Sequence, residues 1–182
     1  YARARIARAG MDDAATIDFQ DYRDTVGSYD GIASIEMIEA VGEQHWPSYF
    51  ATLRSRLKPG ASAAIQAITI REESFDNYRA KPDFIQRYIF PGGMLPTPTH
   101  LAEHAARAGL EFAEVQTFGA SYARTLEAWR VRFNEQWPRV KALGFDERFH
   151  RMWNYYLTYC QAGFERGVIN VGIYRFRRPP VA

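Results

Sequence analysis

The apolar residues of this chain follow two different periods in turn, one typical of strands and one of helices. Strands are predicted where β-forming or nearly continuous apolar residues occur: residues 15–19, 29–35, 61–70, 112–117 and 168–176. Helices are predicted between them, one opened by Pro47 and another by Pro98. Strands that alternate with helices favour an α/β fold, with a doubly wound, mostly parallel sheet and helices on both faces.

Two stretches depart from this simple alternation. Residues 72–96 are predicted to be an inserted segment that contains the turn at 89–93. Residues 121–162 carry aromatic and aliphatic residues three and four apart, which predicts two amphipathic helices between the last two strands. We expect these helices to form an aromatic wall over the carboxyl edge of the sheet, where such folds bind ligands.

The start of the chain carries a further signal. Residues 1–9 are basic and predict a helix that Gly10 ends, with no initiator Met, signal peptide or glycine-rich loop before it. We therefore expect the chain to be a fragment of a longer protein.

Composition narrows the class of protein. A chain of 182 residues with 47% hydrophobic and 24% charged residues is typical of one globular domain. The net charge of +2 does not indicate nucleic-acid binding, and no apolar run approaches the roughly 20 residues of a membrane span. A single Cys indicates a reducing compartment. The aromatic fraction of 15% predicts a large apolar cavity or a partner surface in addition to a core.

Two carboxylates follow the strand predicted to end at residue 35. Glu36 and Glu39 are three residues apart, a spacing that can place both on one face of a helical turn. The apolar neighbours Met37, Ile38 and Val41 would desolvate a carboxylate and raise its pKa. The alternative is that both are solvated loop acids.

Four other residues have both a structural and a functional interpretation. Asp21 and Tyr22 follow the first predicted strand, where they could contact a nucleotide base or form an ordinary Asx turn. Gln66 lies inside a buried strand, so its amide binds either a ligand or a core partner. Tyr122 begins the aromatic helices and is either a core residue or part of a site.

The remaining candidates favour structural roles. His100 and His104 have the spacing of a metal-ligand pair, but no third ligand accompanies them, and a surface helix explains them better. Cys160 falls on an apolar helix face and is expected to be packed and inert. We predict no metal site.

Five stretches together resemble the cyclopropane-fatty-acyl-phospholipid synthase family, whose members are class I methyltransferases that use S-adenosylmethionine. The stretches occur in the family's order and cover nearly the whole chain. They are DYRD at residues 21–24, YDGIASIEMIEAVG at 29–42, RYIFPGG at 87–93, FGASYARTL at 118–126 and RMW at 151–153.

The resemblance implies methylene transfer to the cis double bond of a phospholipid acyl chain, with S-adenosylmethionine and a bound bicarbonate ion as cofactors. By that resemblance, Glu39, Tyr122 and the backbone of Ile68 hold the bicarbonate. Gln66 falls where many members carry a His, a departure shared with a glutamine-bearing branch. The proton lost on ring closure would pass to the bicarbonate, while aromatic rings stabilise the carbocation.

The same resemblance places Asp21, Tyr22 and Ile35 in the adenosine pocket. It also implies a glycine-rich loop and an active-site Cys before Tyr1, so that residues 1–182 would be the carboxyl-terminal part of one methyltransferase domain. The expected partners are unsaturated phospholipid chains at the inner, cytoplasmic face of the cell membrane, with a homodimer as one assembly and no nucleic acid. A methyl-branching enzyme of the same family and an inactive lipid-binding fragment are the alternatives.

Overall fold

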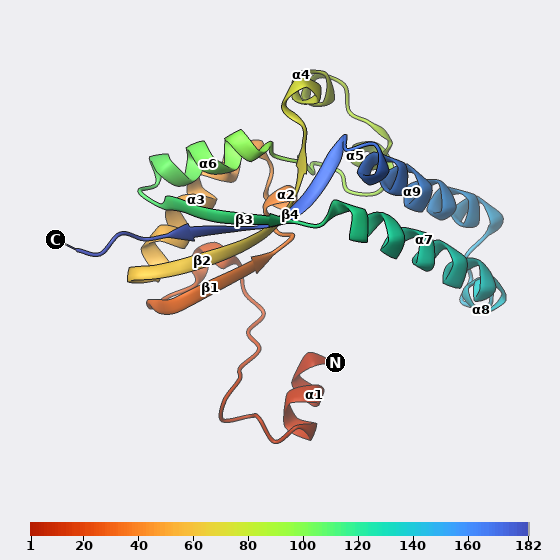
Figure 1. Cartoon of the computed structure of the whole chain (residues 1–182). Helices are drawn as coiled ribbons and strands as arrows, with labels where there is room; N and C mark the ends of the chain where they lie inside the picture. Colours follow the sequence, from red (N-terminus) through yellow and green to blue (C-terminus); the bar gives the residue numbers. More distant parts are fainter. Residues whose placement is uncertain (182) are drawn as a thin grey trace.

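The computed structural model describes residues 1–181 and contains a four-stranded mixed sheet in the order β1-β2-β4-β3 (Figure 1). The pair β1 and β2 is parallel, whereas β4 is antiparallel to both β2 and β3, so three strands share one direction. The mostly parallel α/β sheet is therefore confirmed, with the last strand reversed. The strands are β1 (Tyr29–Ile35), β2 (Leu57–Ile70), β3 (Glu111–Thr117) and β4 (Ile169–Arg177).

Helices form where they are predicted over residues 1–9 and after Pro47 and Pro98. The segment 121–162 holds three α-helices instead of the two predicted, because Pro138 lies in the first turn of a new helix and cannot continue the preceding one. Two short 3-10 turns, η1 (Tyr22–Asp24) and η2 (Glu43–His45), accompany the helices. The α-helices are α1 (Ala2–Arg8), α2 (Ile38–Val41), α3 (Trp46–Arg56), α4 (Glu72–Ala80), α5 (Phe84–Tyr88), α6 (Pro98–Arg107), α7 (Gly119–Glu135), α8 (Trp137–Ala142) and α9 (Glu147–Glu165).

The strand predicted over residues 15–19 is wrong. This segment is part of an irregular connection that joins α1 to the rest of the chain, and α1 lies apart from the sheet (Figure 1). Ile17 and Phe19 are exposed, so the β-forming residues have neither a strand to pair with nor a surface to pack on. Intrinsic β-propensity without those partners does not make a strand.

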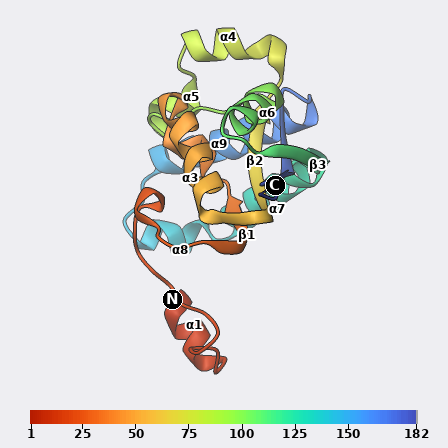
Figure 2. The same ribbon diagram turned by 90° about the vertical axis from the view of Figure 1, so that its left-hand side faces the viewer.

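One face of the sheet carries the larger core. Residues Ala63, Ile65 and Ala67 alternate along β2 and are fully buried beneath α3 and α6, which lie on the same side of the sheet (Figure 2). Phe50 of α3 is also fully buried and packs edge-on against Phe176 of β4, with ring centroids 5.8 Å apart. This packing fixes α3 and, through the chain that precedes it, the end of β1.

The opposite face is covered only near one end. Ile68 of β2 and Val171 of β4 are register partners that point to this face, and they pack with α7 and α9 in a second apolar cluster. Farther along the same face, the side chains of Ile35 and Ile173 are 60% and 37% exposed. Helices thus pack on both faces, as predicted, and the second layer gathers at the carboxyl end of β2.

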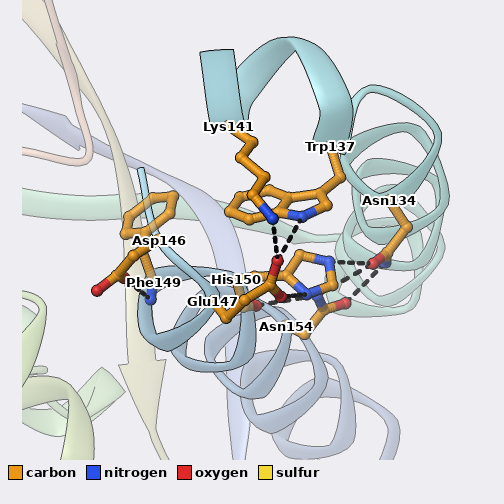
Figure 3. Close-up of polar contacts among 8 residues, drawn as sticks. All are labelled: Asn134, Trp137, Lys141, Asp146, Glu147, Phe149, His150 and Asn154. Carbon is orange, nitrogen blue, oxygen red and sulfur yellow. Dashed lines mark hydrogen bonds and ion pairs between the residues drawn. The ribbon is translucent and has the colours of Figure 1, made fainter. Parts of the chain in front are cut away.

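The helices α7, α8 and α9 project from the sheet as a lobe between β3 and β4 (Figure 1). Polar contacts hold the outer end of this lobe (Figure 3): His150 Nε2 lies 2.8 Å from Asn134 Oδ1, and Asn134 Nδ2 donates to Asn154 Oδ1 at 2.7 Å. Lys141 Nζ donates to Glu147 Oε1 at 3.0 Å. Apolar packing therefore joins the lobe to the sheet, and hydrogen bonds close its far end. Among the described helices, none is long and apolar enough to cross a membrane.

Candidate active site

Glu39 lies in the first turn of α2, directly after β1 ends. Its Oε1 accepts a hydrogen bond of 2.6 Å from the backbone N–H of Ile68 in β2. Its Oε2 is buried, with no hydrogen-bond partner among the described residues. Burial raises the pKa of Glu39 to about 7, and the nearby charge of Glu36 adds to the increase. The predicted desolvation of this carboxylate is thus present in the structure.

Glu36 joins two other members of the predicted site. Its Oε1 accepts one hydrogen bond of 2.8 Å from Gln66 Nε2 and another from the hydroxyl of Tyr122. Gln66 Nε2 also lies 2.7 Å from the Tyr122 oxygen, to which it donates. Burial raises the pKa of Tyr122 to about 12, and its bond to Glu36 adds to the increase. The structure therefore brings Glu39, Gln66, Ile68 and Tyr122 together, although they come from α2, β2 and α7.

The backbone of Glu36 has an unusual conformation. Its φ is +48°, which makes it the one non-glycine residue with a positive φ in the described chain. A left-handed conformation costs a residue with a side chain roughly 1–2 kcal/mol. The backbone N–H of Glu36 donates to the carbonyl of Gln66 at 2.8 Å, so the strained residue is held from both its main chain and its side chain.

This conformation corrects the predicted relationship between the two carboxylates. Glu36 lies outside α2, so the pair does not share a face of one helical turn. In the sequence, Glu36 is recognisable only as a neighbour of Glu39, and its contacts with Gln66 and Tyr122 were not predicted. The three-residue spacing of Glu36 and Glu39 was the one sign in the sequence that Glu36 belongs to the site, since it keeps both carboxylates near the end of β1.

The bicarbonate implied by the family resemblance does not fit these contacts as they stand. The ion would need the donors of Ile68, Gln66 and Tyr122, and those donors bond to carboxylates of the chain itself. Both hydrogens of the Gln66 amide are also used, on Glu36 and on Tyr122. Only the buried Oε2 of Glu39 lacks a described partner.

A hollow of about 560 Å³ lies beside this group of side chains. Tyr22, Ile35 and Glu36 are among the residues that line it, and the Tyr22 ring packs edge-on against Tyr49 at 5.8 Å. Its volume is within the range of small-molecule and cofactor pockets. Two of the three residues predicted for the adenosine pocket therefore line one cavity.

Asp21, the third, has a different environment. Its carboxylate accepts hydrogen bonds from the Arg23 backbone at 2.9 Å and from the Arg23 guanidinium at 2.9 and 2.7 Å. These contacts lower the pKa of Asp21 to about 2, with the guanidinium as the main cause. Asp21 caps η1 and does not line the hollow, which matches the Asx-turn interpretation.

The two histidines and the cysteine are half-buried in apolar surroundings. The His100 ring lies 4.4 Å from the ring of Phe75, and His104 stacks on Phe50 at 6.3 Å. The histidines thus pack among aromatic rings, and burial lowers the pKa of His104. Burial likewise raises the pKa of Cys160 to about 12, as expected for a packed and inert thiol.

Comparison with known proteins identifies the family. The family model described as "Mycolic acid cyclopropane synthetase" matches residues 1–174. The chain belongs to this family. The predicted resemblance is therefore confirmed.

Two curated members of the family show how much of a whole protein this chain represents. It is 44% identical over 171 residues to the tuberculostearic acid methyltransferase UfaA1 of Mycobacterium tuberculosis, a match that covers 93% of the chain and 40% of that protein. It is 36% identical over 155 residues to the cyclopropane-fatty-acyl-phospholipid synthase of Escherichia coli, covering 85% of the chain and 38% of the synthase. The chain thus spans about two fifths of these relatives.

Solved structures give the same fold. The chain is similar to the mycolic acid cyclopropane synthase CmaA1 complexed with SAH and CTAB, with a TM-score of 0.78 and 25% identity over 86% of this chain and 57% of that one. The cyclopropane synthase MmaA2 from Mycobacterium tuberculosis gives a TM-score of 0.82 at 24% identity, over 97% of this chain and 66% of that one. The fold is that of the class I methyltransferases, as predicted.

Proposed function

We propose that this chain is the carboxyl-terminal part of an enzyme that uses S-adenosylmethionine to convert the cis double bond of an unsaturated phospholipid chain into a cyclopropane ring. The observation that carries the proposal is the pair of carboxylates, Glu36 and Glu39, held beside a cofactor-sized hollow in a member of the cyclopropane synthetase family.

The residues that line the hollow are suited to binding a nucleoside cofactor. Tyr22 offers an aromatic ring at one wall, and Ile35 offers an apolar contact at the end of β1. When bound, S-adenosylmethionine supplies an electrophilic methyl group, which the electron pair of the alkene attacks as the carbon–sulfur bond breaks. The residues of this chain would orient the adenosine portion and leave the transferable group near the two carboxylates.

Ring closure requires a proton acceptor and a non-nucleophilic environment for positive charge. The proton leaves the transferred carbon, and the electron pair of that C–H bond forms the last ring bond. Carboxylate oxygens near the hollow supply candidate acceptors, and the rings of Phe118 and Phe164 flank Tyr122 at 5.7 and 5.4 Å. Aromatic faces stabilise a cation without trapping it covalently.

A surface of aromatic residues supports contact with lipid. Phe84 of α5 packs edge-on against Tyr155 of α9 at 4.6 Å. Tyr88 and Phe90 of the inserted segment are exposed, and so is Trp129 on α7. Exposed apolar side chains of this kind are frequent at lipid-binding surfaces. We propose that they meet unsaturated phospholipids at the inner face of the cell membrane. The homodimer remains a prediction.

A second candidate is methyl branching of the acyl chain. It is favoured by the 44% identity to a tuberculostearic acid methyltransferase, against 36% to a cyclopropane synthase. Both reactions begin with the same methyl transfer and differ in the fate of the carbocation.

The test is methyl transfer by the full-length protein. Vesicles of a dioleoyl phospholipid are incubated with the protein and methyl-labelled S-adenosylmethionine, and the label is followed into the lipid. Proton NMR of the released acyl chains then distinguishes upfield ring protons from vinylic protons or a branched methyl group. Ring protons support the proposal, a methylene or methyl branch supports the second candidate, and unlabelled lipid contradicts both.

A further inference from the structure

We propose that the carboxylate of Glu36 takes the place of a bound bicarbonate ion and is itself the proton acceptor of ring closure. This inference rests on the proposed function and deepens it. It predicts that the base is a side chain of the protein itself, so that the enzyme works without added bicarbonate.

The side-chain donors of the site are already paired with the carboxylate of Glu36. Gln66 and Tyr122 are the side-chain donors that the family resemblance assigns to the ion, and both donate to the same oxygen, Glu36 Oε1. A carboxylate and a bicarbonate ion present the same planar pair of oxygens to such donors. Glu36 therefore accepts the hydrogen bonds of Gln66 and Tyr122, which would otherwise require an anion from solution as their acceptor.

Glu36 and Glu39 differ in their position relative to the hollow. It lies at the end of β1, lines the hollow, and is exposed, whereas Glu39 beside it is largely buried. Burial favours the neutral form of Glu39 and raises its pKa. The exposed, hydrogen-bonded carboxylate that faces the hollow is the better placed of the two to receive a proton from a substrate.

The backbone conformation of Glu36 also favours this role. A left-handed glutamate is strained, and strained residues persist where the surrounding structure holds them in place. Here the backbone N–H of Glu36 is tied to the Gln66 carbonyl, and its side chain to Gln66 and Tyr122. These hydrogen bonds hold Glu36 in its left-handed conformation, and in that conformation its carboxylate reaches Gln66 and Tyr122.

The proposed step is balanced. After methyl transfer, one C–H bond of the transferred carbon breaks, and its electron pair closes the ring. The proton passes to Glu36, whose carboxylate becomes a carboxylic acid and later releases the proton to solvent. No oxidant or reductant is needed.

The first experiment measures the rate of the full-length protein in carbon dioxide-free buffer, with and without added bicarbonate. We expect the unmodified protein to be equally active in both. Glu36→Gly suits the left-handed backbone and opens the space between Gln66 and Tyr122. It should lose about 10²–10⁴-fold in rate without bicarbonate and regain at least about tenfold when bicarbonate enters that space. Glu36→Gln keeps the side-chain volume, so it should lose rate without rescue.

Glu103→Gln is the matched control, since Glu103 lies on α6 and pairs with Arg107 at 2.7 Å, away from the hollow. It should leave the rate unchanged. A rate of the unmodified protein that falls in carbon dioxide-free buffer and returns with bicarbonate would overturn the proposal. So would full activity of Glu36→Gly without bicarbonate.

The second experiment does not depend on activity. Isotope-labelled bicarbonate is titrated into the 182-residue chain and into its Glu36→Gly variant, and binding is followed by carbon NMR. We expect the variant to bind bicarbonate at least about tenfold more tightly, and equal binding would contradict the proposal. If the proposed function itself fails, the unmodified full-length protein transfers no label to lipid, while this binding comparison still tests whether Glu36 fills the anion position.

Discussion

The Oε1 atom of Glu39 accepts a 2.6 Å hydrogen bond from the backbone N–H of Ile68, which links the first turn of α2 to the carboxyl end of β2. A backbone donor inside a sheet cannot move independently of its strand. The buried carboxylate is therefore positioned by the sheet itself, and its second oxygen is left for another partner.

Glu39→Gln is the first change that we would make in the full-length protein. The amide keeps the shape and can still accept from Ile68, but it places a donor where the buried Oε2 presents an acceptor. We expect turnover to fall by about 10²–10⁴-fold, with little change in cofactor affinity. The measurement is label transfer to lipid beside calorimetric titration with S-adenosylmethionine. Glu43→Gln, on an acid four residues away that pairs with Arg79 at 2.8 Å, is the control. Near-normal turnover would show that the carboxylate of Glu39 takes no part in the reaction.

The same residue should make stability depend on pH. Because burial raises the pKa of Glu39 from its ordinary value of 4.5 to about 7, the folded chain holds this proton more tightly than the unfolded chain. Its contribution to stability is complete below about pH 4.5 and is lost as the pH rises through about 7. Relative to Glu39→Gln, we expect the unmodified chain to lose roughly 2–3 kcal/mol of unfolding free energy over that range. Urea unfolding of both proteins at the two ends of the range measures it, and a constant difference would contradict the assigned environment.

Gln66→Ala tests the amide that joins Glu36 and Tyr122. The substitution removes one hydrogen bond to a carboxylate and one to a hydroxyl. We expect turnover of the full-length protein to fall about tenfold to a hundredfold. Partial rescue by bicarbonate would favour a bound ion at this position. A loss of thermal stability with an unchanged rate would show instead that Gln66 only satisfies the core.

The 182-residue chain should bind S-adenosylmethionine weakly or not at all. The described residues offer the adenosine side of a pocket, with Tyr22 and Ile35, but no glycine-rich loop of backbone donors for the methionine end. Calorimetric titration should therefore detect no micromolar binding. Tyr22→Ala should weaken any residual affinity, whereas Asp21→Asn should have little effect because Asp21 does not line the hollow. Micromolar binding by the unmodified chain would refute this expectation.

Hydrophobic periodicity predicted most of the fold. The helices opened by Pro47 and Pro98 occur as expected, because each buries a regular set of apolar residues against the same core. The strand over 29–35 also occurs, although only Ser34 is buried in it and Ile32 is partly buried. The predicted strand over 15–19 failed because propensity cannot show whether a neighbouring strand exists. The antiparallel direction of β4 was also not predictable, because side chains alternate every two residues in a strand whichever way it runs beside its neighbour.

The site was predictable only in part, and for a related reason. Glu39 and Tyr122 stood out through their apolar surroundings, and Gln66 through its polarity inside a buried strand. The role of Glu36 depends on one backbone dihedral angle and on the pairing of β1 with β2, neither of which is visible in residue types. Spacing along the chain indicated that two carboxylates were close, but not which donors each would find.

The parallel pairing of Ile35 with Gln66 has a consequence for insertions and deletions. Successive side chains of a strand point to opposite faces, so removing one residue from β2 between Ser62 and Ile65 would draw Ala67 into the place of Gln66 and turn the amide toward the buried face. Every residue of the site would remain in the sequence, yet Glu36 would face a methyl group. Length changes in this strand should therefore abolish the chemistry in proteins that retain all of its side chains, and an alignment that counts only site residues would misjudge them as active.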